Sequence, residues 1–240
     1  MLQLERVSKY FGGLAALSGV SLQVAAGEIL GVIGPNGSGK TTLFNVIAGT
    51  YLPTQGRLWL DSREITRSPP HIRARLGIAR TYQIPRPFHA LSPLENVLVP
   101  LSAGQGLPLS TTMEDRAFDL LCQVGLGPKA NTPIHHLSLI ERKRLELARA
   151  LALNPRFLLV DEVFSGLNPA EVGAAVDLVR GISGEARLGI VIVEHNMRVI
   201  MSLCSRVVVL CFGRKIAEGS PEEVAANPEV IRVYLGERRA

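Results

Sequence analysis

The chain has 240 residues, 47% of them hydrophobic and 20% charged, a balance typical of a globular protein with a sizeable core. The formal net charge of +5 would suit an anionic partner such as a nucleotide, a nucleic acid or lipid headgroups, although ordinary solvated arginines explain it equally well. No apolar run reaches the roughly 18 residues of a spanning helix, and the first residues do not resemble a secretory signal, so we expect neither feature.

The first 60 residues contain four strand-like segments, at 2–7, 20–24, 28–33 and 56–60. Tyr10 and Phe11 stand between the first two, beside a pair of glycines. This aromatic pair could stack on an adenine ring or could fill a turn, and residue chemistry alone favours the turn.

A glycine-rich loop follows the third strand and matches G-x-x-x-x-G-K-[ST]. Glycines let successive backbone N–H groups face an anion, and the helix that begins at Thr41 adds the positive end of its dipole. Lys40 would reach the β- and γ-phosphates of a nucleotide, and the Thr41 hydroxyl would join the Mg²⁺ shell. The predicted phosphate-binding residues are Gly34, Pro35, Asn36, Gly37, Ser38, Gly39, Lys40, Thr41 and Thr42.

The segment 61–90 is rich in arginine and proline, and we expect it to be exposed and irregular, with most of its arginines solvated. It contains one short strand, 78–83, that ends in Gln83. A glutamine in this place could offer its side-chain oxygen to Mg²⁺ or water, or could be an ordinary polar loop residue.

Residues 91–153 have a helical pattern. Ser92 followed by proline is typical of a helix start, and a second helix is predicted over 112–124. Ser138 and Glu141 form a capping-box pattern at the start of a third helix, 139–153.

From residue 154 onward, strands alternate with helices. The expected elements are strand 156–160, helix 169–182, strand 189–193, helix 196–202, strand 206–212 and a short helix after Ser220. This alternation at both ends of the chain predicts a parallel α/β sheet with the helical segment inserted near its middle.

Polar residues stand where two of these strands end. Asp161 follows a wholly apolar strand, where its carboxylate can hold Mg²⁺ through water, and Glu162 can orient or deprotonate an attacking water. His195 follows the next strand and can hydrogen-bond a γ-phosphate or the attacking water. Because ligands collect at the carboxyl ends of parallel strands, these side chains should face the glycine loop.

The phosphate loop, the glutamine, the serine-capped helix, the two carboxylates and the histidine stand in the order found in ABC-transporter nucleotide-binding domains, which the whole chain resembles. The resemblance implies a P-loop NTPase α/β fold: a mainly parallel sheet core, an N-terminal antiparallel β subdomain and an inserted α-helical subdomain. It divides the single ABC ATPase domain, 1–240, into a core with its β subdomain (1–84 and 154–225), a helical subdomain (85–153) and a tail (226–240).

The same resemblance implies a role for each candidate residue. ATP and Mg²⁺ are the expected ligands: Phe11, or Tyr10 beside it, would stack on adenine, and Thr41, Gln83 and Asp161 would surround the metal. Glu162 would be the catalytic base, and His195 would sense the γ-phosphate. Ser138 would face the ATP of a second ABC ATPase subunit, since two such domains enclose each nucleotide between them.

Finer matches are to the ATPases of branched-chain amino acid importers, carried by segments 77–83, 94–99, 165–169 and 227–236. They imply membrane permease subunits, indirectly a solute-binding protein, no nucleic acid, and a place on the cytoplasmic face of the cell membrane. Importers of urea, amides or other small polar solutes share much of this pattern. Two further alternatives are an ABC ATPase that acts on nucleic acid or ribosomes, and a nucleotide-binding module with little turnover.

Two departures from the family pattern affect the signature segment, 137–141, and the loop after the second strand end. Leu139 and Ile140 replace two glycines, and Glu141 brings a carboxylate near the opposing ATP. Asn168 stands where many members have aspartate, so it keeps the hydrogen-bonding shape without the charge. We therefore expect a chain that hydrolyses ATP at its own loop but gives its partner a weaker signature segment.

Overall fold

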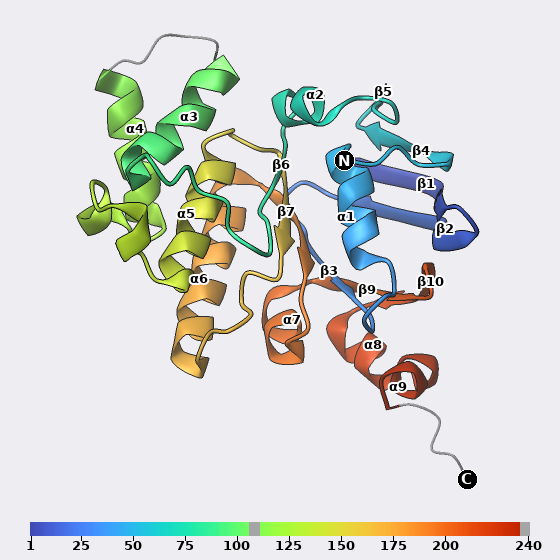
Figure 1. Cartoon of the computed structure of the whole chain (residues 1–240). Helices are drawn as coiled ribbons and strands as arrows, with labels where there is room; N and C mark the ends of the chain where they lie inside the picture. The colour runs from blue at the N-terminus through green and yellow to red at the C-terminus, as the bar shows by residue number, and fades with distance from the viewer. Residues whose placement is uncertain (106–110, 236–240) are drawn as a thin grey trace.

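A computed structural model of the chain describes residues 1–105 and 111–235 and contains two sheets (Figure 1). The first is antiparallel, in the order β2-β1-β4-β5, with strands β1 (Leu2–Phe11), β2 (Leu14–Val24), β4 (Gln55–Leu60) and β5 (Arg63–Glu64). The second has the order β10-β9-β3-β8-β7-β6, with β3 (Ile29–Ile33), β6 (Ile78–Arg80), β7 (Phe157–Asp161), β8 (Gly189–Val193), β9 (Arg206–Cys211) and β10 (Arg214–Gly219).

Five strands of the second sheet run parallel, and β10 joins its edge antiparallel to β9. Every residue of β3, β7 and β8 is buried, as expected of strands covered on both faces. Successive side chains alternate between two cores: Leu30 and Val32 pack with α1 and the first sheet, whereas Ile29 and Ile33 pack with the later helices. The parallel sheet is therefore the central layer of the molecule.

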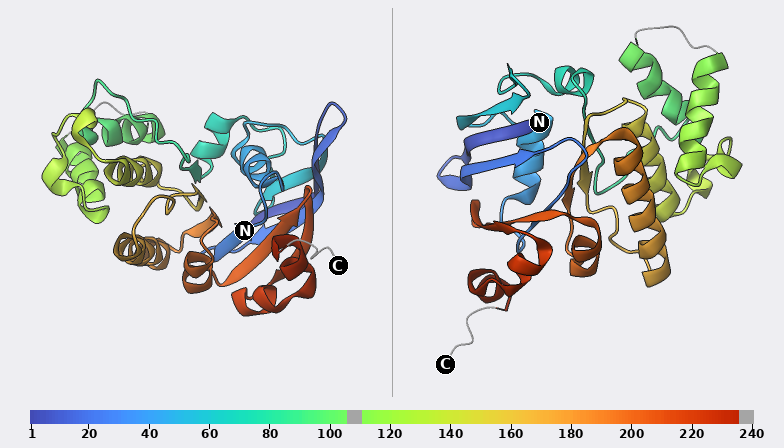
Figure 2. Two further views of the ribbon diagram at one scale, coloured as in Figure 1. Left: turned by 60° about the horizontal axis from the view of Figure 1, so that its bottom comes forward. Right: turned by 180° about the vertical axis from the view of Figure 1, so that it is seen from behind.

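The helices divide between these faces and one end of the molecule. They are α1 (Lys40–Ala48), α2 (Pro70–Arg75), α3 (Pro93–Gln105), α4 (Thr111–Gln123), α5 (Leu139–Leu151), α6 (Pro169–Ala186), α7 (Met197–Leu203), α8 (Pro221–Ala226) and α9 (Pro228–Leu235), with 3₁₀ turns at Gly127–Lys129 and Ile134–His136. In both views of Figure 2, α3, α4 and α5 lie together at the end of the molecule away from β1, β2 and β4. In the described part of the chain, no helix is both long enough and apolar enough to cross a membrane.

The α/β fold class expected from the sequence is confirmed, and so is the antiparallel sheet at the N-terminal end. The helix over 139–153 forms as α5, and Ser138 and Glu141 form the predicted capping box. The boundary of the helical subdomain, 85–153, stays a prediction, and residues 236–240 of the expected tail lie outside the described residues.

The expectation for 61–90 was right that most of its arginines are exposed, as Arg63, Arg67, Arg75 and Arg86 are, and wrong that the whole segment is irregular. This segment contains α2, and the Arg73 side chain of that helix is fully buried. Its guanidinium donates to the carbonyl oxygens of Ser68, Val46, Ile47 and Thr66, so it closes the C-terminal end of α1. Arg80 is also buried for the most part.

The sequence also failed to indicate β10. The expected strand 206–212 ends at Cys211, because Phe212 and Gly213 both have left-handed φ angles, 45° and 74°. Two such residues form the tight turn that reverses the chain, and Cys211 pairs with Arg214 across it. A Phe-Gly pair is not one of the usual signals for that turn.

Candidate functional site

The phosphate loop joins β3 to α1 at the carboxyl edge of the parallel sheet. Gly34, Gly37 and Gly39 have φ angles of 150°, 78° and 104°, which side-chain-bearing residues rarely adopt. A Cβ at Gly34 would lie 2.1 Å from Leu210 O, and one at Gly39 would lie 2.5 Å from Ala16 O. The loop conformation therefore requires glycine at both ends.

Polar groups inside this loop fit a phosphate group. Lys40 Nζ donates to Gly34 O at 2.8 Å and Pro35 O at 2.9 Å, so its amino group lies within the turn. Burial lowers the pKa of Lys40, while the charges of Glu162 and Asp161 act in the opposite direction. Ser38 Oγ is buried with no hydrogen-bond partner in the described structure. A phosphate oxygen would satisfy this hydroxyl and the Lys40 ammonium together.

An open cleft of about 630 Å³ lies over the loop. Its walls come from four parts of the chain: loop residues 36–42, β1 and β2 through Phe11 and Ala16, the strand ends through Glu162 and His195, and the β9–β10 turn through Phe212. Tyr10 is not among the lining residues, so of the two candidate aromatics only Phe11 reaches the cleft. The Phe11 ring packs edge-on against Tyr51, with the ring centroids 5.3 Å apart.

The Glu162 carboxylate joins two of the predicted site residues. Its Oε2 accepts from Gln83 Nε2 at 2.5 Å, and its Oε1 lies 2.7 Å from His195 Nε2. The three residues come from the ends of β6, β7 and β8, which are neighbours in the sheet. The Gln83 amide oxygen, the atom that a metal would need, is not used in this contact.

Asp161 lies at the last position of β7 and is 5% exposed. Its Oδ2 pairs with Arg80 Nη2 at 2.8 Å, and its backbone N–H donates to Thr81 Oγ1 at 3.2 Å. Among the residues that the structure describes, no group of three or more His, Cys, Asp or Glu side chains could hold a metal. A magnesium site here would use the Thr41 hydroxyl, the Gln83 amide, the Asp161 carboxylate and phosphate oxygens, all hard ligands that Mg²⁺ accepts.

Ser138 does not line the cleft. It caps α5, where its Oγ lies 3.1 Å from Glu141 Oε2 and accepts from Glu141 N at 3.3 Å. The Glu141 carboxylate also pairs with Lys129 Nζ at 2.6 Å, so the negative charge of the signature segment has a cation beside it. Ser138 is exposed at the start of α5, outside this cleft.

Three residues beside the site were given no role from the sequence. Arg80 pairs with Asp161, and Lys143 of α5 donates to the loop after Glu162. Glu194 is 3% exposed and accepts from the backbone N–H groups of Phe164 and His195; burial raises its pKa. The residue types of Arg80 and Lys143 give no local signal. Glu194 stands at the end of an apolar strand, as Asp161 does, and the sequence shows this position without indicating what the carboxylate does.

Two family models match the chain: one described as ABC transporter, over residues 17–165, and one described as branched-chain amino acid ATP-binding cassette transporter, over residues 214–240. The chain is 39% identical to the lipopolysaccharide export system ATP-binding protein LptB of Acidithiobacillus ferridurans, over 99% of this chain and 98% of that protein. It is 36% identical to the high-affinity branched-chain amino acid transport ATP-binding protein BraF of Pseudomonas aeruginosa, again over 99% and 98%.

Solved structures of ATP-binding cassettes also match the chain. The ADP conformation of MJ1267, an ATP-binding cassette of an ABC transporter, has a TM-score of 0.89 and 32% identity, with 99% of both chains covered. The dimeric post-hydrolysis state of the cassette MJ0796, bound to ADP and Pi, has a TM-score of 0.83 and 29% identity over 92% of this chain and 99% of that one. The family model, the full-length relatives and the fold lead to one assignment: this chain belongs to the ABC transporter family, as an ATP-hydrolysing subunit.

Proposed function

We propose that the chain energises the uptake of a branched-chain amino acid through separate membrane permease subunits. The C-terminal match and the BraF relative support this solute class. The LptB relative, at a slightly higher identity, is named for lipopolysaccharide export, so export of a lipid is the competing function.

The observation that carries the catalytic part of the proposal is the position of the Glu162 carboxylate, between Gln83 and His195 and on the cleft over the phosphate loop. Glu162 takes a proton from the attacking water, and His195 hydrogen-bonds the same water or the γ-phosphate. Lys40 and the N–H groups of the loop hold the phosphates and offset the charge that develops on them. Bound Mg²⁺ would supply further charge neutralisation, held by Thr41, Gln83 and Asp161.

The proposed assembly is a pair of ABC ATPase subunits at the cytoplasmic face of the membrane, with Ser138 of each chain facing the ATP of the other. The dimeric MJ0796 structure, with its bound ADP and Pi, supports this pairing. A solute-binding protein completes an importer. The helical subdomain, 85–153, carries the signature segment in this proposal and belongs to the surface that meets the partner.

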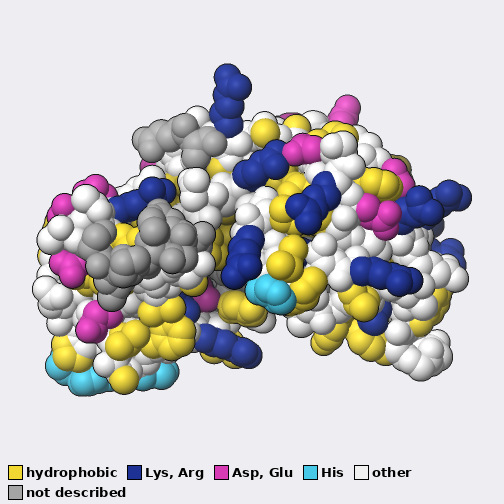
Figure 3. Space-filling view, turned by 90° about the horizontal axis from the view of Figure 1, so that it is seen from above, with side chains coloured by type: hydrophobic (Ala, Val, Ile, Leu, Met, Phe, Trp, Pro, Cys, Tyr) yellow, Lys and Arg dark blue, Asp and Glu magenta, His cyan; other side chains and the backbone are white. Residues whose placement is uncertain are grey.

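Two other functions remain as outcomes to test. A nucleic-acid partner calls for a continuous basic surface, whereas on the face shown in Figure 3 the Lys and Arg side chains are scattered among hydrophobic and uncharged ones. A binding module with little turnover would not need the Glu162 carboxylate, and this carboxylate lines the cleft.

Catalysis is tested by single-turnover hydrolysis of ATP by the full chain and its Glu162→Gln variant. We expect the variant to bind ATP with unchanged affinity and to hydrolyse it at least about a hundredfold more slowly. Equal, negligible rates in both proteins would favour the binding module.

The solute class is tested by co-purifying the chain with its permease subunits, reconstituting them in vesicles and measuring ATP-dependent leucine uptake. Amides and urea are the matched controls for other small polar solutes. Uptake of leucine alone supports the proposal. If lipopolysaccharide stimulated the ATPase activity and no leucine were taken up, lipid export would be the function instead of amino acid uptake.

A further inference from the structure

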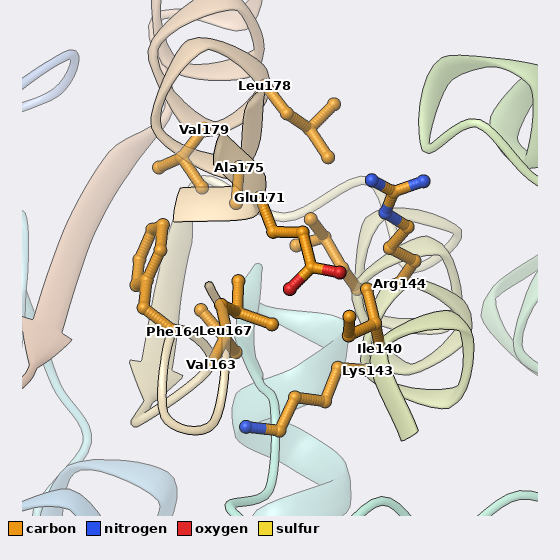
Figure 4. Close-up of a pocket in the computed structure, with 11 residues that line it drawn as sticks. Ile140, Lys143, Arg144, Val163, Phe164, Leu167, Glu171, Ala175, Leu178 and Val179 are labelled. Carbon is orange, nitrogen blue, oxygen red and sulfur yellow. The ribbon is translucent and has the colours of Figure 1, made fainter. Parts of the chain in front are cut away.

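Lys143 lies on α5, three residues after Ile140, beside the loop that follows β7. In Figure 4, α5 faces the loop after β7 and the start of α6 across a small apolar cavity of about 40 Å³. Ile140 and Leu147 of α5 line it together with Val163, Phe164 and Leu167. The Lys143 side chain runs along this wall, and its amino group points away from Glu171 and Arg144.

The three hydrogen bonds of the Lys143 ammonium all go to one short turn. Nζ donates to Ser165 O at 2.6 Å, to Ser165 Oγ at 2.9 Å and to Glu162 O at 3.2 Å. The side chain is 7% exposed, and an ammonium has only three protons to donate. Burying a lysine ammonium without hydrogen-bond acceptors would cost free energy. The acceptors in this turn therefore explain how Lys143 can be buried.

The turn that Lys143 holds has an unfavourable backbone conformation. Glu162 has φ of 48°, in the left-handed region, although its side chain has no local reason to prefer it. This conformation costs about 1 kcal/mol or more in a residue other than glycine and persists only where neighbours enforce it. The neighbours here are Val193 O, which accepts from Glu162 N at 3.0 Å, and Lys143 with Ser165 Oγ, which both donate to Glu162 O.

The backbone of Glu162 sets the direction of its carboxylate. With its N–H fixed by β8 and its carbonyl fixed by α5, the side chain extends to Gln83 and His195 at 2.5 and 2.7 Å. A displacement of about 1 Å in a reacting group can lower a rate by about a hundredfold. Lys143 therefore connects α5 to the backbone of the residue that carries the predicted catalytic carboxylate.

We propose that Lys143 is a positioning residue for Glu162 and makes the catalytic carboxylate of each chain depend on the position of that chain's own signature helix, α5. The proposal rests on the proposed role of Glu162 as the base. It adds a connection within one chain to the contacts that the signature segment makes with the opposing ATP.

The test is a double-mutant cycle on the full chain that combines Lys143→Met with Glu162→Gln, with Lys143→Arg as the conservative variant. Arg144→Met is the matched control, because it removes the next cation on the same helix. For each protein, kcat, KM and the equilibrium affinity for ATP are measured, with single-turnover rates for the slow variants.

Lys143→Met should lower kcat about tenfold or more, while KM and ATP affinity change less than about twofold. Lys143→Arg should recover most of the rate, and Arg144→Met should match the parent chain. In the Glu162→Gln background, Lys143→Met should cause no further loss, because the residue acts through Glu162.

Equal losses in both backgrounds, a loss of ATP affinity at unchanged kcat, or an inactive Lys143→Arg variant would each overturn the proposal. If Lys143→Met does not fold, Ser165→Ala removes one acceptor and gives the same test, with a smaller kcat loss and the same absence of effect in Glu162→Gln. A Glu162→Gln variant with the parental rate would instead refute the role of Glu162 itself, which separates the two failures.

Discussion

Arg80 holds the Asp161 carboxylate in a buried ion pair, with Nη2 and Oδ2 2.8 Å apart and side chains only 9% and 7% exposed. The other arm of the guanidinium donates to Asn45 Oδ1 of α1 at 2.5 Å. The pair forms because β6 lies beside β7 in the sheet, so the carboxylate predicted to serve Mg²⁺ has a cation as its neighbour. Arg80 therefore links the Asp161 carboxylate to the helix that follows the phosphate loop.

Arg80→Met should lower the free energy of unfolding by about 3 kcal/mol, since it leaves a buried carboxylate without its partner. Mg²⁺ with ATP should restore more stability in this variant than in the parent chain, because the metal supplies the missing positive charge. Thermal unfolding with and without Mg-ATP measures both effects. Arg86→Met, a change at an exposed cation of the same segment, is the control, and an unchanged midpoint in Arg80→Met would contradict the prediction.

Phe11 and Tyr10 should differ in their effect on nucleotide binding, because only Phe11 lines the cleft. Phe11→Ala should weaken ATP binding about tenfold through the loss of base stacking, whereas Tyr10→Ala should leave it nearly unchanged. Tripolyphosphate, which has no base, should bind both variants like the parent chain. Titration calorimetry with ATP and with tripolyphosphate measures these affinities. An equal loss of ATP affinity in both variants would mean that Tyr10 contributes to base stacking as much as Phe11.

The capping box of α5 should make stability depend on pH. The hydrogen bond from Lys129, and then the one from the Ser138 backbone, lower the pKa of the Glu141 carboxyl below its ordinary 4.5. A carboxyl whose pKa is lower in the folded state adds stability above pH 4.5, and this stability is lost as the pH falls through the folded pKa.

Lys129→Met should therefore reduce stability at pH 7 and flatten its decline below pH 4.5. The effect is about 0.5 kcal/mol, since Lys129 is largely exposed and solvent screens the pair. Urea unfolding at pH 7, and again at a pH below the pKa of Glu141 in the folded chain, measures this difference in stability. Lys129→Arg is the charge-conserving control. If stability had the same pH dependence in the parent chain and in Lys129→Met, the Lys129–Glu141 pair would not contribute to it.

The two residues that replace the signature glycines should behave differently. Leu139 is 56% exposed, whereas Ile140 lines the cavity between α5 and α6. Leu139→Gly should cost at most about 1 kcal/mol of stability and should raise the dimer fraction at saturating ATP, while Ile140→Gly should cost about 2 to 3 kcal/mol through lost burial. Light scattering in the Glu162→Gln background and urea unfolding give the two readouts.

Ser138→Ala tests the same signature segment at the residue that caps α5. It removes the cap of α5, worth about 1 kcal/mol, and should lower coupled ATPase. Full coupled activity in this variant would mean that the signature segment does not contribute to the partner's site.

Several residues that the sequence predicted for the site do lie on one cleft, while their catalytic and binding roles stay predictions. Gly34 to Thr42, Glu162 and His195 carry their chemistry in their type and in their place after apolar strands, and the structure brings these strand ends together at one cleft. Gln83 was a weak signal alone, yet its amide meets Glu162. A loop that needs glycine geometry and a strand that ends in a carboxylate are both local patterns.

What could not be predicted depends on partners distant in sequence. Nothing in the sequence distinguishes Arg73 from a surface arginine. Its hydrogen-bond acceptors are the carbonyl oxygens of Val46 and Ile47 in α1, 27 and 26 residues away. The buried guanidinium of Arg80 likewise depends on Asp161, 81 residues later, and on Asn45, 35 residues earlier. Burial lowers the pKa of Arg73 to about 10, a measure of an environment that composition does not reveal.

The turn between β9 and β10 connects the C-terminal part of the chain to the phosphate loop. Gly213 N donates to Ser38 O at 3.0 Å, and Ser18 N donates to Gly213 O at 2.8 Å, so this turn supports the phosphate loop from behind. The segment that matches the branched-chain model begins at the next residue, 214. A change that moves this turn would therefore reach the phosphate loop through its backbone, without any change in the sequence of the loop itself.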